Sequence, residues 1–244
     1  MHPINLAEEV SEYVENHIGS FHTRRLAKLA NLRLKAVLKR KNPYLFRAKD
    51  LTPEGLVQQL LEAHLSSQEE TLFGEFLEGL AIFVCSRTVG GRKSAVPGID
   101  IEFEREGILY LVAVKSGPNW ANSRQLEKLR DDFKRAKRIH RTNNPHSQVV
   151  AINGCCYGRD EQPDKGDYYK YCGQQFWTFI TGQDDFYLKI IEPLGYRAKE
   201  KNQQFLEAFA RVRDQFVEEL LRDFCNGYRI NWARLVQYNS AANG

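Results

Sequence analysis

The stretch PGIDIEFEREGILYLVAVKSGPNW, residues 97–120, decides the fold. Apolar and polar residues alternate through IDIEFE, which is typical of a strand with one buried face, and ILYLVAVKS is a mostly apolar run of strand length. Glu106-Gly107 lies between the two segments and is the expected turn. The stretch therefore predicts a β-hairpin whose second strand ends in a lysine, Lys115.

The hairpin is expected to bring an acid and a lysine together. Residues two apart on a strand share a face, so Asp100 and Glu102 point the same way. If the hairpin pairs around Gly107, Asp100 comes beside Lys115 at one end of the sheet. The carboxylate would hold Mg²⁺, with the Val114 carbonyl as an extra ligand, and the lysine would orient a water or neutralise charge on the phosphate. This arrangement predicts metal-assisted phosphodiester hydrolysis.

The segments Pro97-Gly-Ile-Asp100 and Ala113-Val-Lys115 have the layout of the PD-(D/E)xK nucleases, except that Ala113 stands where Asp or Glu is expected. By itself so short a match is more commonly a surface ion pair. If Ala113 is an introduced change, the natural residue would be Glu and this copy would be inactive. Otherwise a displaced acid is needed at the metal.

Two glutamates are the main candidates for that acid. Glu102 is nearest in sequence, and Glu78, in GEFLE, lies on the helix that precedes the hairpin. Glu75 falls on an adjacent helix face, and an ordinary solvated glutamate is the preferred interpretation there. The predicted catalytic residues are therefore Asp100, Lys115, Glu78 and Glu102, with metal ligands drawn from Asp100, Val114, Glu78 and Glu102.

Longer phrases carry a more specific resemblance. SSQEETLFGEFLEGLAIFV, GIDIEFE, VKSGPNWANS, VVAINGCCYGRD, DKGDYYKYCGQQFW and IIEPLGYRAKE look like the PmeII-type family of type II restriction endonucleases, from about Asn42 to the C-terminus. The resemblance implies a homodimer that uses Mg²⁺ to cut both strands of duplex DNA at a short specific sequence.

The remaining pattern predicts an α/β (α+β) fold, with a mixed central sheet flanked by helices. Residues before 85 and after 200 have helical periodicity, and LTPEGLVQQLLEAHL and SSQEETLFGEFLEGLAIFVCSRT are expected to be separate helices. RQLEKLRDDFKRAKRIHR is a helix after the hairpin, and QVVAING and QFWTFITG are the expected third and fourth strands. We expect a basic helical region at 1–65, a restriction-endonuclease-like core at 66–200, and a helical extension at 201–244 packed on that core.

Charge and polar side chains indicate where DNA would lie. No acid occurs between Asn16 and Lys49, which suits a DNA clamp or a dimer contact, and equally a solvated helix face. The loop after Lys115 and the long segment NGCCYGRDEQPDKGDYYKY supply the expected DNA contacts. These residues are Ser116, Asn119, Trp120, Asn122, Ser123, Arg124, Asn153, Tyr157, Arg159, Lys165 and Tyr168.

Several function classes fit the composition poorly. No apolar run has the length of a membrane span, the N-terminus lacks the layout of a signal peptide, and five cysteines suit a reducing compartment, so a cytoplasmic protein is expected. The absence of a C-x-x-C pair disfavours zinc. The alternatives are a catalytically silent or structure-specific DNA-binding protein of the same fold, or an RNA-binding helical protein, which leaves the hairpin acids unexplained.

Overall fold

The computed structural model describes residues 6–143 and 148–242. The chain divides into two compact units: unit 1 comprises residues 1–18 and 73–196, and unit 2 comprises residues 19–72 and 197–244. The C-terminal residues thus group with residues 19–72. The chain passes between the units within α1 (Leu6–Ala30) and α4 (Pro53–Thr88).

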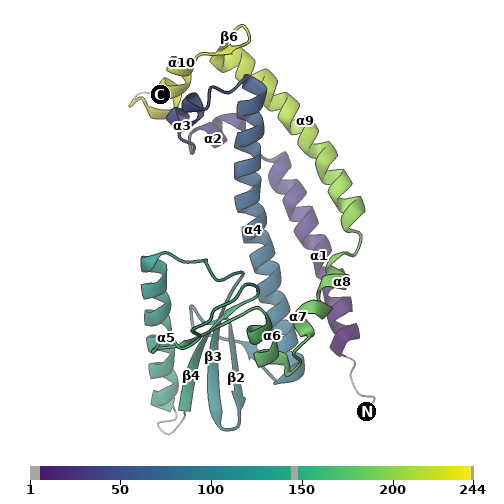
Figure 1. Cartoon of the computed structure of the whole chain (residues 1–244), viewed down its shortest axis with the longest axis vertical. Helices are drawn as coiled ribbons and strands as arrows, with labels where there is room; N and C mark the ends of the chain where they lie inside the picture. Colours follow the sequence, from purple (N-terminus) through teal and green to yellow (C-terminus); the bar gives the residue numbers. More distant parts are fainter. Residues whose placement is uncertain (1–5, 144–147, 243–244) are drawn as a thin grey trace. The chain divides into compact units, whose positions relative to one another are not determined.

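Unit 1 is built on a five-stranded mixed sheet (Figure 1). The strands are adjacent in chain order; the pairs β1–β2 and β2–β3 are antiparallel, and β3–β4 and β4–β5 are parallel. Together with the helices beside it, this sheet confirms the expected fold class. The strands are β1 (Arg92–Lys93), β2 (Ile101–Arg105), β3 (Ile108–Lys115), β4 (Gln148–Cys155) and β5 (Tyr169–Cys172).

The turn between β2 and β3 fixes the register of the hairpin. Arg105 pairs with Ile108, which leaves the two-residue turn Glu106-Gly107. Both turn residues have positive φ, 54° and 75°. Two-residue hairpin turns of this kind match the twist of the strands, and glycine adopts such φ values without a steric penalty. The expected hairpin and its turn are confirmed.

Helices cover both faces of the sheet. Leu129 and Phe133 of α5 (Ser123–Asn143) pack in one core cluster with Ala113 of β3. On the other face, α6 (Gln174–Thr181) places the Phe176 ring against Gly154 of β4, where an added Cβ would lie 2.2 Å from that ring. Gly154 pairs with Val114, so α5 and α6 lie on opposite faces.

Two local predictions were wrong. QFWTFITG is not a strand but α6, which ends at the left-handed Gly182 and buries Phe176, Trp177 and Ile180 at helical spacing. The helices expected on either side of Ser66-Ser67 are one 36-residue helix, α4. Serine does not break a helix as proline does, and the burial pattern continues through this point.

The rest of unit 1 packs around the second half of α4. Tyr13 of α1 stacks on Phe83 of α4 with ring centroids 4.3 Å apart, and Glu9 pairs with Arg87 at 3.0 Å. Two short helices, α7 (Phe186–Lys189) and α8 (Ile191–Leu194), follow α6. Unit 1 therefore holds the whole sheet and the helical segment that carries Glu78.

Unit 2 is a helical assembly with its own core. Leu56, Leu60 and Leu61 of α4 are fully buried against the aromatic residues Phe216 and Phe224 of α9. Its other elements are α2 (Leu34–Leu38), α3 (Pro43–Ala48), α9 (Ala198–Phe224), the hairpin of β6 (Cys225–Asn226) and β7 (Arg229–Ile230), and α10 (Trp232–Ser240).

Part of the acid-free basic segment is neutralised within unit 2. Arg25 pairs with Glu69, Lys35 with Asp223 at 2.8 Å, and Arg47 with Asp50 at 2.5 Å. The pKa of His64 is lowered first by burial and second by the nearby positive charges of Lys41, Arg40 and Lys28. The segment thus combines structural ion pairs with one cluster of cations.

Neither a disulfide nor a membrane span is found in the described chain. All five cysteines are buried free thiols. Within residues 6–143 and 148–242, no helix is both long and apolar enough to cross a membrane.

Candidate active site

Asp100 is held at the open end of the hairpin by three backbone hydrogen bonds. Its carboxylate Oδ2 accepts from the Val114 N–H at 2.6 Å, its own N–H donates to the Val112 carbonyl at 2.9 Å, and its carbonyl accepts from the Ser94 N–H at 3.1 Å. The side chain is therefore fixed across the two strands of the hairpin. The bond from the Val114 N–H favours the ionised form of the acid.

Lys115 is the last residue of β3 and lies near Asp100. Burial raises the pKa of Asp100. The positive charge of Lys115 is the largest effect in the opposite direction. The Lys115 Nζ also sits over the Trp120 ring, 5.1 Å from its centroid. A cation over an indole face is stabilised by the ring quadrupole, so Trp120 restrains the ammonium group.

Glu78 of α4 joins this pair. The pKa of Glu78 is raised, first because burial removes water from its carboxylate and second because of the nearby negative charge of Asp100. Lys93 and Lys115 act in the opposite direction on Glu78, as they do on Asp100. The structure thus brings together two poorly solvated carboxylates and two lysines.

Lys93 was not singled out from the sequence. The sequence pattern around it, with glycines and a proline, is typical of a loop. In the structure Lys93 lies on the short strand β1 and pairs with Ile101, which places it near Asp100. A lone lysine in a loop gives no sequence signal for such a role.

Glu102 belongs to a different cluster. Its buried carboxylate accepts from Arg92 Nε at 2.8 Å and from the Ser94 hydroxyl at 3.1 Å, and it lies 3.5 Å from His140 Nε2 of α5. The Glu102 side chain therefore contacts residues of β1 and α5. Although it shares a strand face with Asp100, the carboxylate that interacts with Asp100 is Glu78.

The position of the missing acid is apolar. Ala113 is fully buried in the cluster formed with Leu129 and Phe133 of α5. Its neighbour across the parallel pairing is Asn153, which is also fully buried and whose Nδ2 has no hydrogen-bond partner in the described structure. Asn153 is therefore not at the surface, where a base edge is read.

The donor atoms of the site suit a hard cation. Asp100 and Glu78 offer carboxylate oxygens, which Mg²⁺ prefers. The described residues contain no group of three or more His, Cys, Asp or Glu side chains arranged to hold a metal. A cation here would therefore need further oxygen donors from the backbone, water or substrate, as is usual for Mg²⁺.

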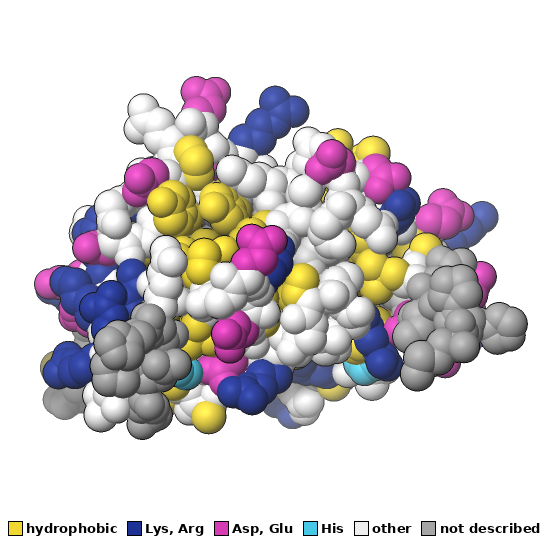
Figure 2. Space-filling view, turned by 90° about the horizontal axis from the view of Figure 1, so that it is seen from below, with side chains coloured by type: hydrophobic (Ala, Val, Ile, Leu, Met, Phe, Trp, Pro, Cys, Tyr) yellow, Lys and Arg dark blue, Asp and Glu magenta, His cyan; other side chains and the backbone are white. Residues whose placement is uncertain are grey.

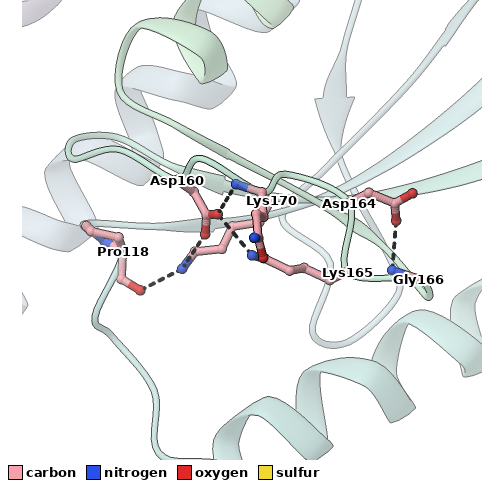
Figure 3. Close-up of polar contacts among 7 residues, drawn as sticks. Pro118, Asp160, Asp164, Lys165, Gly166 and Lys170 are labelled. Atoms are coloured by element: carbon pink, nitrogen blue, oxygen red, sulfur yellow. Dashed lines mark hydrogen bonds and ion pairs between the residues drawn. The ribbon is translucent and has the colours of Figure 1, made fainter.

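A polar clamp, formed by Asp160, Lys165, Lys170 and the Pro118 carbonyl, ties the long loop to the segment after Lys115 (Figure 3). Lys170 Nζ donates to the Pro118 carbonyl at 3.0 Å and lies 3.2 Å from Asp160 Oδ2, while Lys165 lies 2.9 Å from Asp160 Oδ1. Burial acts to raise the pKa of Asp160, but the hydrogen bonds from Lys165, the Gln162 N–H and Lys170 lower it on balance.

The same two segments also pack closely. An added Cβ on Gly117 would lie 2.3 Å from the Tyr157 ring, and one on Gly158 would lie 2.5 Å from Pro118. The backbone N–H groups of Cys156 and Tyr157 donate to the carbonyls of Lys115 and Ser116. The loop after Lys115 and residues 156–170 thus form one rigid surface.

The predicted DNA contacts divide into four groups. Tyr168 is buried against Phe133, with ring centroids 5.6 Å apart, and is a core residue like Asn153. Lys165 belongs to the polar clamp, and Asn122 caps α5 by accepting from the Gln125 N–H at 3.1 Å. Ser116 and Trp120 are half-buried. The exposed residues are Asn119, Ser123, Arg124, Tyr157 and Arg159.

Replacing Lys170 with Met tests the polar clamp. It removes the only cation that bridges Asp160 to the Pro118 carbonyl among the described contacts, and we expect it to lower the free energy of unfolding by about 2 kcal/mol. Lys165→Met leaves that bridge intact and should cost less, about 1 kcal/mol or below. Chemical denaturation measures both; equal losses would show that the bridge to Pro118 has no special weight.

The clamp should also depend on pH. Because the pKa of Asp160 is lowered in the folded protein, its stabilising effect is complete above the ordinary aspartate pKa of about 4 and disappears as pH falls through the folded value. Wild type should therefore exceed Asp160→Asn in stability at pH 7 and lose this advantage in acid. A difference independent of pH would contradict the ion-pair interpretation.

One comparison with known proteins identifies the family of the chain. The family model of the type II restriction endonuclease EcoO109I matches residues 8–202, which is 195 of the 244 residues. No curated protein matches the chain. The expected PmeII-type relationship is not confirmed, but the broader expectation of a restriction endonuclease is. The chain belongs to the EcoO109I family of type II restriction endonucleases.

Proposed function

We propose that this protein is a Mg²⁺-dependent endonuclease that cuts both strands of duplex DNA at a short specific sequence. Membership of a type II restriction endonuclease family makes DNA the substrate class. The observation that carries the catalytic part is the meeting of Asp100, Glu78 and Lys115 at the open end of the β2–β3 hairpin.

Asp100 and Glu78 are the side chains that would hold the metal. The negative charge of Asp100 contributes to the raised pKa of Glu78, and a divalent cation between the carboxylates would relieve their repulsion. The N–H and C=O of a residue in an extended strand point to the same side. The Val114 carbonyl therefore faces Asp100 as its N–H does, and is the proposed third protein ligand.

Mg²⁺, when bound, polarises the phosphate and lowers the pKa of a water molecule. Lys115 would donate hydrogen bonds to that water or to a phosphate oxygen, and so stabilise negative charge that develops during cleavage. Its contact with Trp120 keeps the ammonium group at the strand end, where a flexible lysine would otherwise sample many positions. Lys93 supplies a second positive charge beside both acids.

The exposed polar residues next to this site are the proposed DNA contacts. Asn119, Ser123 and Arg124 lie where α5 begins, and the N-terminus of a helix attracts phosphate. Tyr157 and Arg159 lie on the loop that the polar clamp holds, and are the candidates for base contacts. The basic cluster of unit 2 would contact either the duplex or a second subunit, and a homodimer would match a two-fold symmetric site.

A catalytically silent DNA-binding protein is the second candidate. It is favoured by Ala113, a buried apolar residue at the position of the second acid in the PD-(D/E)xK pattern. A silent protein would bind DNA in the presence of Mg²⁺ without cutting it. The two candidates therefore differ in one observable, which is cleavage.

Digestion of a large mapped DNA with Mg²⁺, followed by sequencing of the ends, tests the proposed function. We expect discrete fragments with one common terminal sequence. Lys115→Ala should reduce the cleavage rate by about 100-fold or more while binding to the same DNA persists. Wild-type protein that binds DNA but leaves it intact would support the silent candidate, and a Lys115→Ala variant that cuts at the normal rate would remove the mechanism.

Exchanging each candidate acid for its amide locates the second metal ligand. Glu78→Gln should reduce cleavage and raise the Mg²⁺ concentration needed for half-maximal rate. Glu102→Gln is the matched control: it disturbs the contacts with Arg92 and His140, so it should lower the unfolding temperature but retain cleavage. The assignment to Glu78 fails if Glu78→Gln retains full activity, and both assignments fail if neither variant loses it.

A further inference from the structure

The second half of α5 carries a stripe of four cations that the proposed active site does not use. Lys134, Lys137, Arg138 and Arg141 line a groove on the surface of unit 1, together with Thr142. They are three or four residues apart, so they occupy one side of the helix. We call these four residues the α5 stripe.

Acidic side chains offset little of the stripe's charge. None of the four cations makes an ion pair with a carboxylate in the described part of the chain; Lys137 Nζ donates to the Asp167 backbone carbonyl at 2.9 Å. The negative charge of Asp167 acts to raise the pKa of Lys137 and so partly offsets its charge. The sequence has no Asp or Glu between Asp132 and Asp160. Lys134, Arg138 and Arg141 therefore have no acidic partner among the described contacts.

The cations also repel one another. The pKa of Lys137 is lowered, chiefly by burial and next by the positive charge of Arg141. Like charges are held this close because the opposite side of α5 is anchored: Leu129, Phe133 and Ala136 pack in the core against the sheet. Figure 2, seen from the end at which the β2–β3 turn lies, shows dark-blue side chains gathered on the left, where α5 ends.

The stripe is linked to the candidate active site through the loop that the polar clamp holds. Lys137 and Arg130 both contact Asp167, which ends the loop held by the polar clamp. That clamp reaches Pro118, three residues after Lys115. The stripe begins about 16 Å along α5 from Ser123 and extends about 11 Å, at 1.5 Å per residue.

We propose that the α5 stripe binds the sugar-phosphate backbone of duplex DNA beyond the bond that is cut. The inference rests on the proposed function and adds a sequence-independent contact to it. A stripe about 11 Å long faces about three phosphates of one strand, which are spaced 3.4 Å along the duplex axis. Clustered lysines and arginines gain affinity there because each phosphate contact releases condensed counterions.

The salt dependence of DNA binding tests this proposal. The probe is a fluorescent 40-base-pair duplex of random sequence, with EDTA present so that no cleavage occurs. The variant Lys134→Ala/Arg138→Ala/Arg141→Ala keeps Lys137, whose bond to Asp167 is structural. If three phosphate contacts are lost, the slope of log K against log salt should fall by about 2.7 in magnitude. Between 50 and 200 mM salt, wild type would then lose roughly 40-fold more affinity than the variant.

The matched control removes three cations that already have acidic partners. Lys189 pairs with Asp185, Arg197 with Glu200 and Arg213 with Asp214, so Lys189→Ala/Arg197→Ala/Arg213→Ala has the same loss of formal charge. Its salt slope should equal that of wild type. Equal unfolding temperatures of the stripe variant and wild type would exclude a folding defect.

Each outcome is decisive. The stripe proposal is overturned if the salt slope of the stripe variant matches that of wild type, or falls no more than that of the control. In that case, cleavage by the wild type still supports the proposed nuclease function. A fall in slope on duplex RNA but not on duplex DNA also overturns it. Wild type that binds no duplex DNA overturns the stripe and the proposed function together.

Discussion

The antiparallel pairing of β2 with β3 is the constraint on which the candidate site depends. The two-residue turn at Glu106-Gly107 sets the register, and that register brings Asp100 opposite the end of β3. The 2.6 Å hydrogen bond from the Val114 N–H then fixes the Asp100 carboxylate beside Lys115. A slip of one residue would move these side chains to opposite faces of the sheet and separate the acid from the lysine.

Burial and nearby positive charge act in opposite directions on the acids of the site. Burial makes two neighbouring carboxylates difficult to ionise, and Lys93 and Lys115 partly offset this effect. Such a cluster contributes little to stability, since desolvation of charged groups opposes their attraction. Perturbed acids next to a lysine are more typical of functional sites than of structural ion pairs. The Glu102 cluster differs, because direct partners from two elements surround its carboxylate.

Local patterns in the sequence predicted the features that depend on nearby residues. The alternation in IDIEFE and the Glu-Gly turn predicted the hairpin. Local patterns failed where distant residues decide the outcome. QFWTFITG is rich in strand-forming residues, yet it folds as a helix because its aromatic residues find buried partners: Phe176 packs on Gly154 of β4, and Trp177 packs on Phe186.

The choice of the second acid illustrates the same limit. Glu102 and Glu78 were equivalent in the sequence because periodicity gives the face of an element but not the elements that pack against it. His140 and Arg92, which contact Glu102, and Lys93, whose charge acts on Glu78, belong to no motif. Likewise, the polar loop around Asp160 was expected to face DNA, whereas Tyr168 and Asn153 prove to be core residues.

The most direct test of the account is the location of a divalent cation by anomalous diffraction, from crystals of the protein with duplex DNA and Mn²⁺. The account predicts one peak between the carboxylates of Asp100 and Glu78, at about 2.0–2.3 Å from their oxygens and close to the Val114 carbonyl. A peak at Glu102, or an ordered Asp100–Glu78 pair without a cation beside a bound duplex, would contradict it.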